Sequence, residues 1–195
     1  AEAATFDKDI SITADIDMTD KAWTPIEGYV GNVYGNGNKI KGLTAPLFGT
    51  TAASIENLHL TDADITVSEV GNLRIGALAG KIDNATAVIT NCSAEGKMTI
   101  NCTMTEAIDE IFIGGLIGEI TTTKECSELC NKLDIVIDGT YKNTIRTGGC
   151  IGDIRNGALI NSSNLGTITF NGSTGSTHAF SAGLVAYAKV LTNCT

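Results

Sequence analysis

The segment Ile113-Gly114-Gly115-Leu116-Ile117-Gly118-Glu119-Ile120 determines the fold, because copies of it recur along the chain. Close copies occupy residues 75–82 and 148–154, and looser copies occupy residues 45–49 and 182–188. Their final small residues lie at positions 49, 80, 118, 152 and 186, so the copies are 31, 38, 34 and 34 residues apart. Such a period predicts a stack of similar units, each packed mainly on its neighbours.

A second motif keeps the same irregular period. Ile55-Glu56-Asn57-Leu58 recurs at residues 89–92, 126–129, 159–162 and 191–194. Its third residue is Asn in every copy except one, which has Glu128. We expect this Asn inside the coil or at a corner, where it would bond to the next coil and stack in a ladder.

Alternating apolar and polar residues follow the Asn position. The clearest examples are residues 96–100, 133–137 and 166–170. Alternation is typical of a strand with one buried face, so each repeat is predicted to be a coil of about three short strands. Differences in repeat length are expected in outer loops near residues 103–111, 121–125 and 139–146.

Composition supports an all-β chain and limits its partners. The 195 residues include 22 Gly and only 2 Pro, and the formal net charge is −9. The negative charge argues against nucleic acid or an anionic membrane as a partner. No apolar run approaches the roughly 20 residues that span a bilayer, so no integral membrane segment is expected.

The first 44 residues differ from the rest. Residues 10–18 alternate in polarity and are predicted to form one half-buried strand, and Gly35-Asn36-Gly37-Asn38 predicts a hairpin turn or a coil corner. We therefore divide the chain into a capping segment, residues 1–44, and one continuous repeat domain, residues 45–195.

Two faces are expected along the repeated strand of residues 113–120. Leu116, Gly118 and Ile120 share the face that we assign to the core. The opposite column is apolar at Ile117 and its equivalents, yet it also carries charge. Its charged members are Lys81, Glu119 and Asp153. We expect loops of the same coil to cover this column, with a partner protein as the alternative.

The chain resembles the GLUG-repeat proteins, which occur in bacterial surface and adhesin-like polypeptides. Gly115-Leu116-Ile117-Gly118 fits the Gly-Leu-hydrophobic-Gly motif fully, and residues 77–80, 149–152 and 183–186 depart at one or two positions. Residues 12–43 resemble the segment that commonly precedes such repeats, although Tyr34-Gly35-Asn36-Gly37 replaces the usual Asp-Gly-Asn-Gly.

The resemblance implies a right-handed parallel β-helix (β-solenoid), here of about five coils. It also implies export to the bacterial cell surface, flanking domains in a longer chain, and a role in adhesion or as a spacer. The motif is structural, so it transfers no catalytic residue, cofactor or metal site. Its glycines are expected to allow tight packing between coils.

Acidic pairs are the candidates for chemistry, since residues two apart on a strand share a face. The pairs are Asp15 with Asp17, Asp62 with Asp64, and Asp134 with Asp138. Each pair could bind Ca²⁺ or act as acid and base on a glycosidic bond. Alternation alone already explains them as the polar side of a strand, and we prefer that interpretation.

Aromatic residues suggest a different site. Trp23, Tyr29 and Tyr34 gather in the leading segment, where they could stack on sugar rings or pack over the end of the core. His59 occupies the polar position of an alternating strand, and His178 lies in a Gly/Ser/Thr-rich loop, so neither indicates catalysis.

The cysteines are interpreted as small buried hydrophobes, although disulfides stay open in an exported protein. They are Cys92, Cys102, Cys126, Cys130, Cys150 and Cys194. Cys126 and Cys130 lack the further ligands that a zinc site needs.

Together these features predict a non-enzymatic repeat module of a bacterial surface protein, an adhesin domain or stalk that contacts a host protein or glycan. A carbohydrate-active β-helix enzyme, either a polysaccharide lyase or a glycoside hydrolase, is the alternative. A pure spacer without a ligand is a third possibility.

Overall fold

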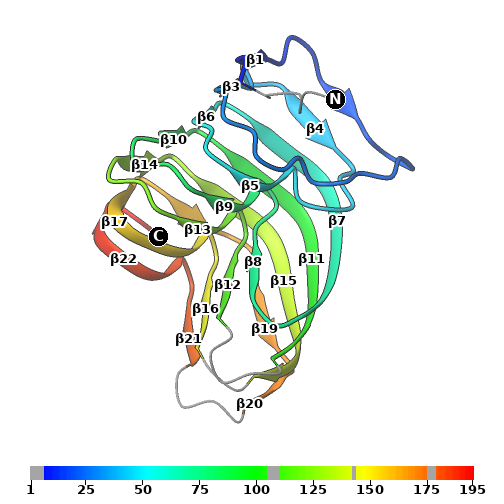
Figure 1. The fold of residues 1–195 in the computed structure, drawn as a ribbon, viewed down its shortest axis with the longest axis vertical. Coiled ribbons are helices and arrows are strands. Elements are labelled where there is room, and N and C mark those ends of the chain that lie inside the picture. The colour runs from blue at the N-terminus through cyan, green and yellow to red at the C-terminus, as the bar shows by residue number, and fades with distance from the viewer. Residues whose placement is uncertain (1–6, 105–109, 142–143, 175–178) are drawn as a thin grey trace.

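In the computed structural model, which describes residues 7–104, 110–141, 144–174 and 179–195, strands wind into a parallel β-solenoid (Figure 1). The strands form three sheets, here named A, B and C. The described residues contain strands and turns only, and no helix among them is long and apolar enough to cross a membrane.

Sheet A has 10 strands in the order β1-β3-β6-β10-β14-β17-β13-β9-β5, with β22 paired to β17. The strands are β1 (Ile10–Ser11), β3 (Val33–Tyr34), β5 (Phe48–Thr51), β6 (Ile55–Glu56), β9 (Ala79–Ile82), β10 (Ile89–Thr90), β13 (Ile117–Ile120), β14 (Glu125–Ser127), β17 (Ile151–Ile160) and β22 (Val185–Thr192).

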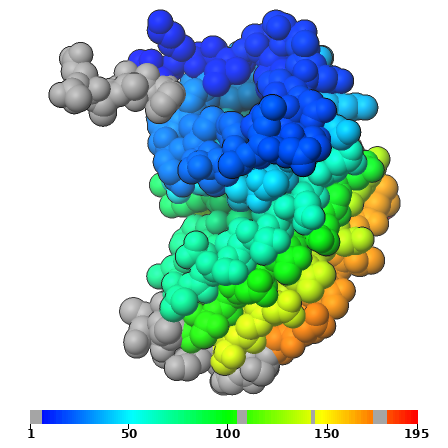
Figure 2. All heavy atoms as spheres, turned by 90° about the vertical axis from the view of Figure 1, so that its right-hand side faces the viewer, coloured from blue at the N-terminus to red at the C-terminus, as the bar shows by residue number. Residues whose placement is uncertain are grey.

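Sheet B has 8 strands and contains the longest strands of the molecule among the described residues. The strands are β2 (Ile16–Asp17), β4 (Lys39–Lys41), β7 (His59–Val70), β11 (Ser93–Thr103), β15 (Cys130–Tyr141), β18 (Ser163–Asn164), β19 (Ile168–Phe170) and β20 (Ser173–Thr174). In the space-filling view β7, β11, β15 and β19 appear as successive bands (Figure 2).

Sheet C has 4 strands, which lie between sheets B and A along each full coil. The strands are β8 (Leu73–Ile75), β12 (Ile111–Gly114), β16 (Ile145–Gly148) and β21 (Ala179–Ala182). A full coil thus has four segments, such as β10, β11, β12 and β13, instead of the predicted three.

Equivalent residues of successive coils pair in parallel, as the period predicted. Ile117 pairs with Ala79 before it and with Ile151 after it, and Ile89 pairs with Ile55 and Cys126. The solenoid makes about four turns, slightly fewer than the predicted five. The shorter N-terminal rungs lack a sheet C strand in the described residues; β1 pairs with β3, and β3 pairs with β6.

The single strand predicted over residues 10–18 is wrong. Two short strands, β1 and β2, are separated by a bend, and the side chains of Ile10 and Ile16 are exposed. Both strands lie at the end of the stack, where no earlier coil of the described chain covers them. The division of the chain at residue 44 stays a prediction.

The single strand predicted over residues 113–120 is also wrong, because the chain bends at Gly115 and Leu116, between β12 and β13. β12 consequently lies against β13 and β17. Ile117 and Ile151, on the column that we assigned to the outside, are fully buried. Both side chains belong to the main hydrophobic core, whereas the backbone of sheet C lies against Gly118 and Gly152, which we had assigned to the core face.

The glycines at this bend allow close contact between coils, as expected. A methyl group at Gly149 would collide with the carbonyl oxygen of Gly183 in the next coil, and one at Gly114 with the carbonyl oxygen of Cys150 in the next coil. Because these obstacles are backbone atoms, no side-chain adjustment would relieve the collision.

The repeated Asn forms exposed corners, not inward positions. Asn57, Asn91, Asn161 and Asn193 have φ values of 53°, 48°, 48° and 50°, in the left-handed region that Asn tolerates. Asn91 Nδ2 donates to Asn57 Oδ1 at 2.8 Å, and Asn193 Nδ2 donates to Asn161 Oδ1 at 3.3 Å. Glu128 occupies the same conformation, with φ 56°, and separates the two pairs.

Candidate functional site

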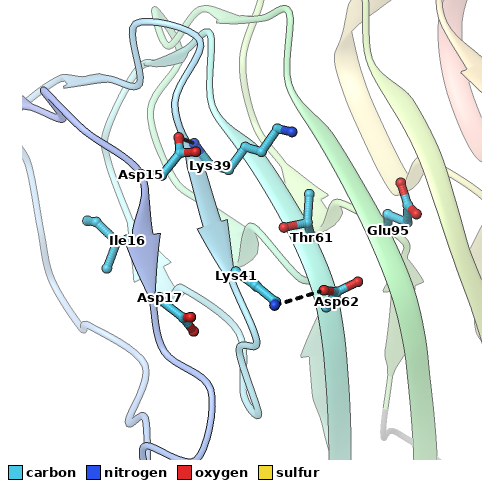
Figure 3. A pocket seen from close by; sticks show the side chains of 8 residues that line it. All are labelled: Asp15, Ile16, Asp17, Lys39, Lys41, Thr61, Asp62 and Glu95. Carbon is cyan, nitrogen blue, oxygen red and sulfur yellow. Dashed lines mark hydrogen bonds and ion pairs between the residues drawn. The ribbon is translucent and has the colours of Figure 1, made fainter.

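A groove of about 530 Å³ crosses the outer face of sheet B near its N-terminal end (Figure 3). Four neighbouring rungs supply the side chains around it, from β2, β4, β7 and β11 with the residue before β2. The lining residues are Asp15, Ile16, Asp17, Lys39, Lys41, Thr61, Asp62 and Glu95. Carboxylates and ammonium groups thus share one open surface.

A β-bulge in β7 shapes the groove. Leu60 pairs with Ala94 and Ala63 pairs with Gly96, so Thr61 and Asp62 lie opposite Glu95 alone. Asp62 has φ 50°, which turns the strand locally. Its Oδ2 lies 3.6 Å from the Nζ of Lys41 on the neighbouring rung, and this ion pair spans the groove (Figure 3).

Two carboxylates at the edge of the groove are held in place by the backbone. Asp17 accepts a hydrogen bond from the backbone N of Thr19 at 2.9 Å, and Asp15 accepts one from the backbone N of Lys39 at 2.8 Å. Hydrogen bonds from the Thr19 side chain and backbone lower the pKa of Asp17, and the Lys41 and Lys21 charges add to the effect. Asp17 is therefore a charged acceptor at neutral pH.

The other acidic residues singled out in the sequence lie along sheet B. Asp64 forms an ion pair with Lys97 at 3.2 Å, and Asp134 accepts hydrogen bonds from the hydroxyl and backbone of Thr167. The Thr167 bonds lower the pKa of Asp134. Within the described ranges, no three His, Cys, Asp or Glu side chains converge as metal ligands.

The three aromatic candidates do not gather at one surface. Tyr29 is 2 % exposed, stacks on Phe48 at 5.5 Å between ring centroids, and donates its hydroxyl hydrogen to the Lys8 carbonyl. Trp23 is half-buried and donates to the Pro46 carbonyl at 2.9 Å, whereas Tyr34 is partly exposed on β3. A glycan role for these residues stays a prediction. Of the three, only Trp23 and Tyr34 are exposed enough to contact a sugar.

His59 and the cysteines occupy structural positions. His59 Nδ1 lies 2.9 Å from Ser93 Oγ on the next rung, and burial, with nearby Lys39 and Lys132, lowers the pKa of His59. His178 lies outside the described residues.

None of the six cysteines, all of them described, forms a disulfide, and four of them are buried. Burial raises the pKa of Cys92, Cys126 and Cys150 to about 12. These thiols therefore act as small apolar side chains, as the sequence indicated.

A second charged site, which sequence reasoning missed, lies where sheet C folds back on sheet A. Phe112 of β12 is fully buried, and the guanidinium carbons of Arg74, Arg146 and Arg155 lie 5.0, 5.2 and 5.8 Å from its ring centroid. The buried carboxylates of Glu119 and Asp153 pair with these arginines.

The sequence carried a partial signal for this site. Glu119 and Asp153 were recognised as charges on an otherwise apolar column, but their arginine partners were not identified. Arg74 donates its Nε–H to Glu119, and Arg146 Nη1 donates to Asp153 Oδ2 at 2.6 Å. Glu119 and Asp153 of the charged column thus belong to an ion-pair network in which the carboxylates are buried, whereas Lys81 pairs with Asp83 outside it.

Comparison with known proteins supports the expected family. The family described as the GLUG motif matches residues 71–101, which include β8, β9, β10 and most of β11. Residues 71–101 carry a GLUG motif. This match is consistent with a GLUG-repeat protein, in agreement with the motif series in the sequence. No curated protein matches the chain.

A solved structure has the same fold. It is a crystal structure of a protein from Bacteroides ovatus described as a "putative immunoglobulin A1 protease". The TM-score is 0.58 at 18% sequence identity, and the match covers 95% of this chain and 67% of that one. At this identity the similarity concerns the fold of the GLUG solenoid, not its activity.

Proposed function

We propose that this chain is a non-catalytic GLUG solenoid module of a bacterial cell-surface protein, an adhesin domain or stalk, and that it binds a glycan along the sheet B groove. The observation that carries the proposal is the groove itself, in which carboxylates and ammonium groups of four rungs face solvent together. Beneath the groove β2, β4 and the start of β7 pair in register, and the bulge in β7 sets Thr61 and Asp62 opposite Glu95.

The groove suits a hydroxyl-rich ligand. Sugar hydroxyls both donate and accept hydrogen bonds, so they can pair with the carboxylates of Asp15 and Asp17 and with the ammonium groups of Lys39 and Lys41. Charge-assisted bonds of this kind are stronger than neutral ones.

The electrostatics of Asp17 oppose a role for this residue as a catalytic acid. A glycosidase needs one carboxylic acid whose pKa is raised, so that it is protonated when substrate is bound. The pKa of Asp17 is lowered, which opposes such a role. The carbohydrate-active alternative would require another carboxylate of the groove to supply the proton.

Matched pairs of variants on one sheet face test the proposal. Lys41→Gln with Asp62→Asn removes an exposed ion pair that lines the groove, and Lys97→Gln with Asp64→Asn removes a similar exposed pair that does not. On an array of bacterial and host glycans, we expect the first double variant to lose binding at least 10-fold and the second to bind like the parent protein.

Three results would contradict this function. Arrays of glycans that stay blank would leave a stalk without a ligand, and binding to host proteins instead of glycans would replace the ligand class. Release of reducing ends or unsaturated sugars from a bound polysaccharide would show an enzyme.

A further inference from the structure

A second cavity, separate from the groove, lies at the charged site between sheets C and A. It has a volume of about 370 Å³ and opens beside β16, β17 and β22. Its lining residues are Glu110, Arg146, Asp153, Arg155, Asn156 and Tyr187. We call this cavity the notch.

Asp153 is the unusual group of the notch. Its side chain is 0 % exposed, and its Oδ2 accepts a hydrogen bond from Arg146 Nη1. Its Oδ1 has no hydrogen-bond partner among the described residues, and Arg155 Nε lies 3.6 Å from it. A buried acceptor without a donor is costly, so such an atom calls for a group that the protein does not itself supply.

Arg155 offers the complementary function. Its side chain is 45 % exposed, and its contacts with Glu119 Oε1 and Asp153 Oδ1 are 3.5 and 3.6 Å long, beyond good hydrogen-bond distance. The planar guanidinium therefore keeps donors that can hold a carboxylate through two parallel bonds. Asn156, exposed beside it, adds an amide donor.

Tyr187 supplies an apolar wall. Its side chain is 52 % exposed, and the guanidinium carbon of Arg146 lies 5.5 Å from its ring centroid on one side. Tyr187 pairs with Asp153 across neighbouring rungs, which places the ring next to the buried carboxylate. An exposed aromatic ring in this position can stack on the C–H face of a sugar.

We propose that the notch binds an acidic sugar residue. The carboxylate of the sugar pairs with Arg155 and Asn156, a hydroxyl donates to Asp153 Oδ1, and the ring packs on Tyr187. A neutral sugar lacks the anion, and an acidic amino-acid side chain lacks the hydroxyl, so neither satisfies all three features. This site shares no residue with the groove and does not depend on glycan binding there.

Titration of the whole chain with methyl galacturonoside and methyl galactoside, which differ only in the carboxylate, tests the proposal. Calorimetry or NMR should show at least 10-fold tighter binding of the uronide. Arg155→Gln should abolish that preference, and Arg155→Lys should retain part of it. Lys124→Gln, a change of an exposed charge outside the notch, should have no effect.

Several outcomes would overturn the proposal. The proposal fails if the uronide does not bind, if both glycosides bind equally, or if Arg155→Gln still prefers the uronide. It also fails if N-acetylglutamate amide, which has the carboxylate but no sugar hydroxyl, binds as tightly as the uronide. Unfolding curves of the Arg155 variants separate lost binding from lost folding. The Lys41→Gln and Asp62→Asn double variant should bind the uronide normally, so failure of the groove and failure of the notch are distinguishable.

Discussion

Two glycines at the same motif position should respond in opposite ways to the same substitution. Gly149 and Gly183 are the first residues of the GLxG-like segments 149–152 and 183–186, which belong to successive coils. Gly149 is covered by the following coil, whereas Gly183 is exposed in the last described coil. Gly149→Ala and Gly183→Ala therefore separate the effect of packing between coils from the effect of the motif itself.

The structure gives the size of each effect. A methyl group at Gly149 would meet the carbonyl oxygen of Gly183 and the side-chain amide of Asn164, far inside contact distance. Overpacking costs about 1–3 kcal/mol, and we expect the upper end because one obstacle is backbone. A methyl group added at Gly183 would have no atom beyond its chain neighbours within 4 Å, and φ of Gly183 is outside the left-handed region. Gly183→Ala should therefore raise the free energy of unfolding by about 0.4–1 kcal/mol.

Urea unfolding monitored by circular dichroism measures both free energies. Gly149→Ala should lower the free energy of unfolding by about 3 kcal/mol, and its Tm should fall by about 6–12 °C for a domain of this length. A repeat stack can unfold in parts, so Trp23 fluorescence should be followed to check that the transitions coincide. Equal losses in both variants, or no loss in Gly149→Ala, would refute packing between coils as the reason for glycine here.

Three further predictions concern corners, thiols and ion pairs. Glu128→Asn should raise the free energy of unfolding by about 0.5–1 kcal/mol in urea titrations, because Asn tolerates left-handed φ better and can bridge Asn91 and Asn161; a loss would exclude such a ladder. At pH 8, alkylation followed by mass spectrometry should label only Cys130 and Cys194 before unfolding. Because burial raises the folded pKa of Cys92, Cys126 and Cys150 to about 12, the folded state binds more protons above pH 9 and stability should fall as pH rises towards 12; rapid labelling of these thiols in the native protein would refute their burial. Arg146→Gln should cost about 3–5 kcal/mol, since it leaves the buried Asp153 charge without its close partner, whereas Arg155→Gln, at an exposed position, should cost at most about 1 kcal/mol; equal costs would contradict this assignment.

Periodicity predicted the stack because register leaves a direct trace in sequence. Two motifs recur with the same unequal spacing. In the structure, equivalent residues of successive copies pair with each other, as Ile89 does with Cys126 and Ile117 with Ile151. Alternation likewise located the strand that became β15, where Leu133, Ile135 and Ile137 are fully buried. Repeat spacing and alternation of polarity can both be read directly from a single sequence.

The bend at the repeated motif could not be predicted in the same way. A strand that is buried on both faces and a bent strand whose two halves cover each other have the same apolar sequence. Gly114 and Gly115 permit a bend, but they equally permit close packing of straight strands. Only the three-dimensional structure shows that the strand bends here and that the coils also pack closely at these glycines.

The missed bend also explains the missed notch. On a straight strand, seven residues span about 23 Å and place their side chains on opposite faces, so Arg146 and Asp153 would never meet. The bend at Gly149 and Cys150 instead brings Arg146 Nη1 within 2.6 Å of Asp153 Oδ2. The residues that let the coils pack closely thus also create the buried carboxylate on which the proposed acidic-sugar site depends. A variant that straightens this bend should lose the site along with the packing.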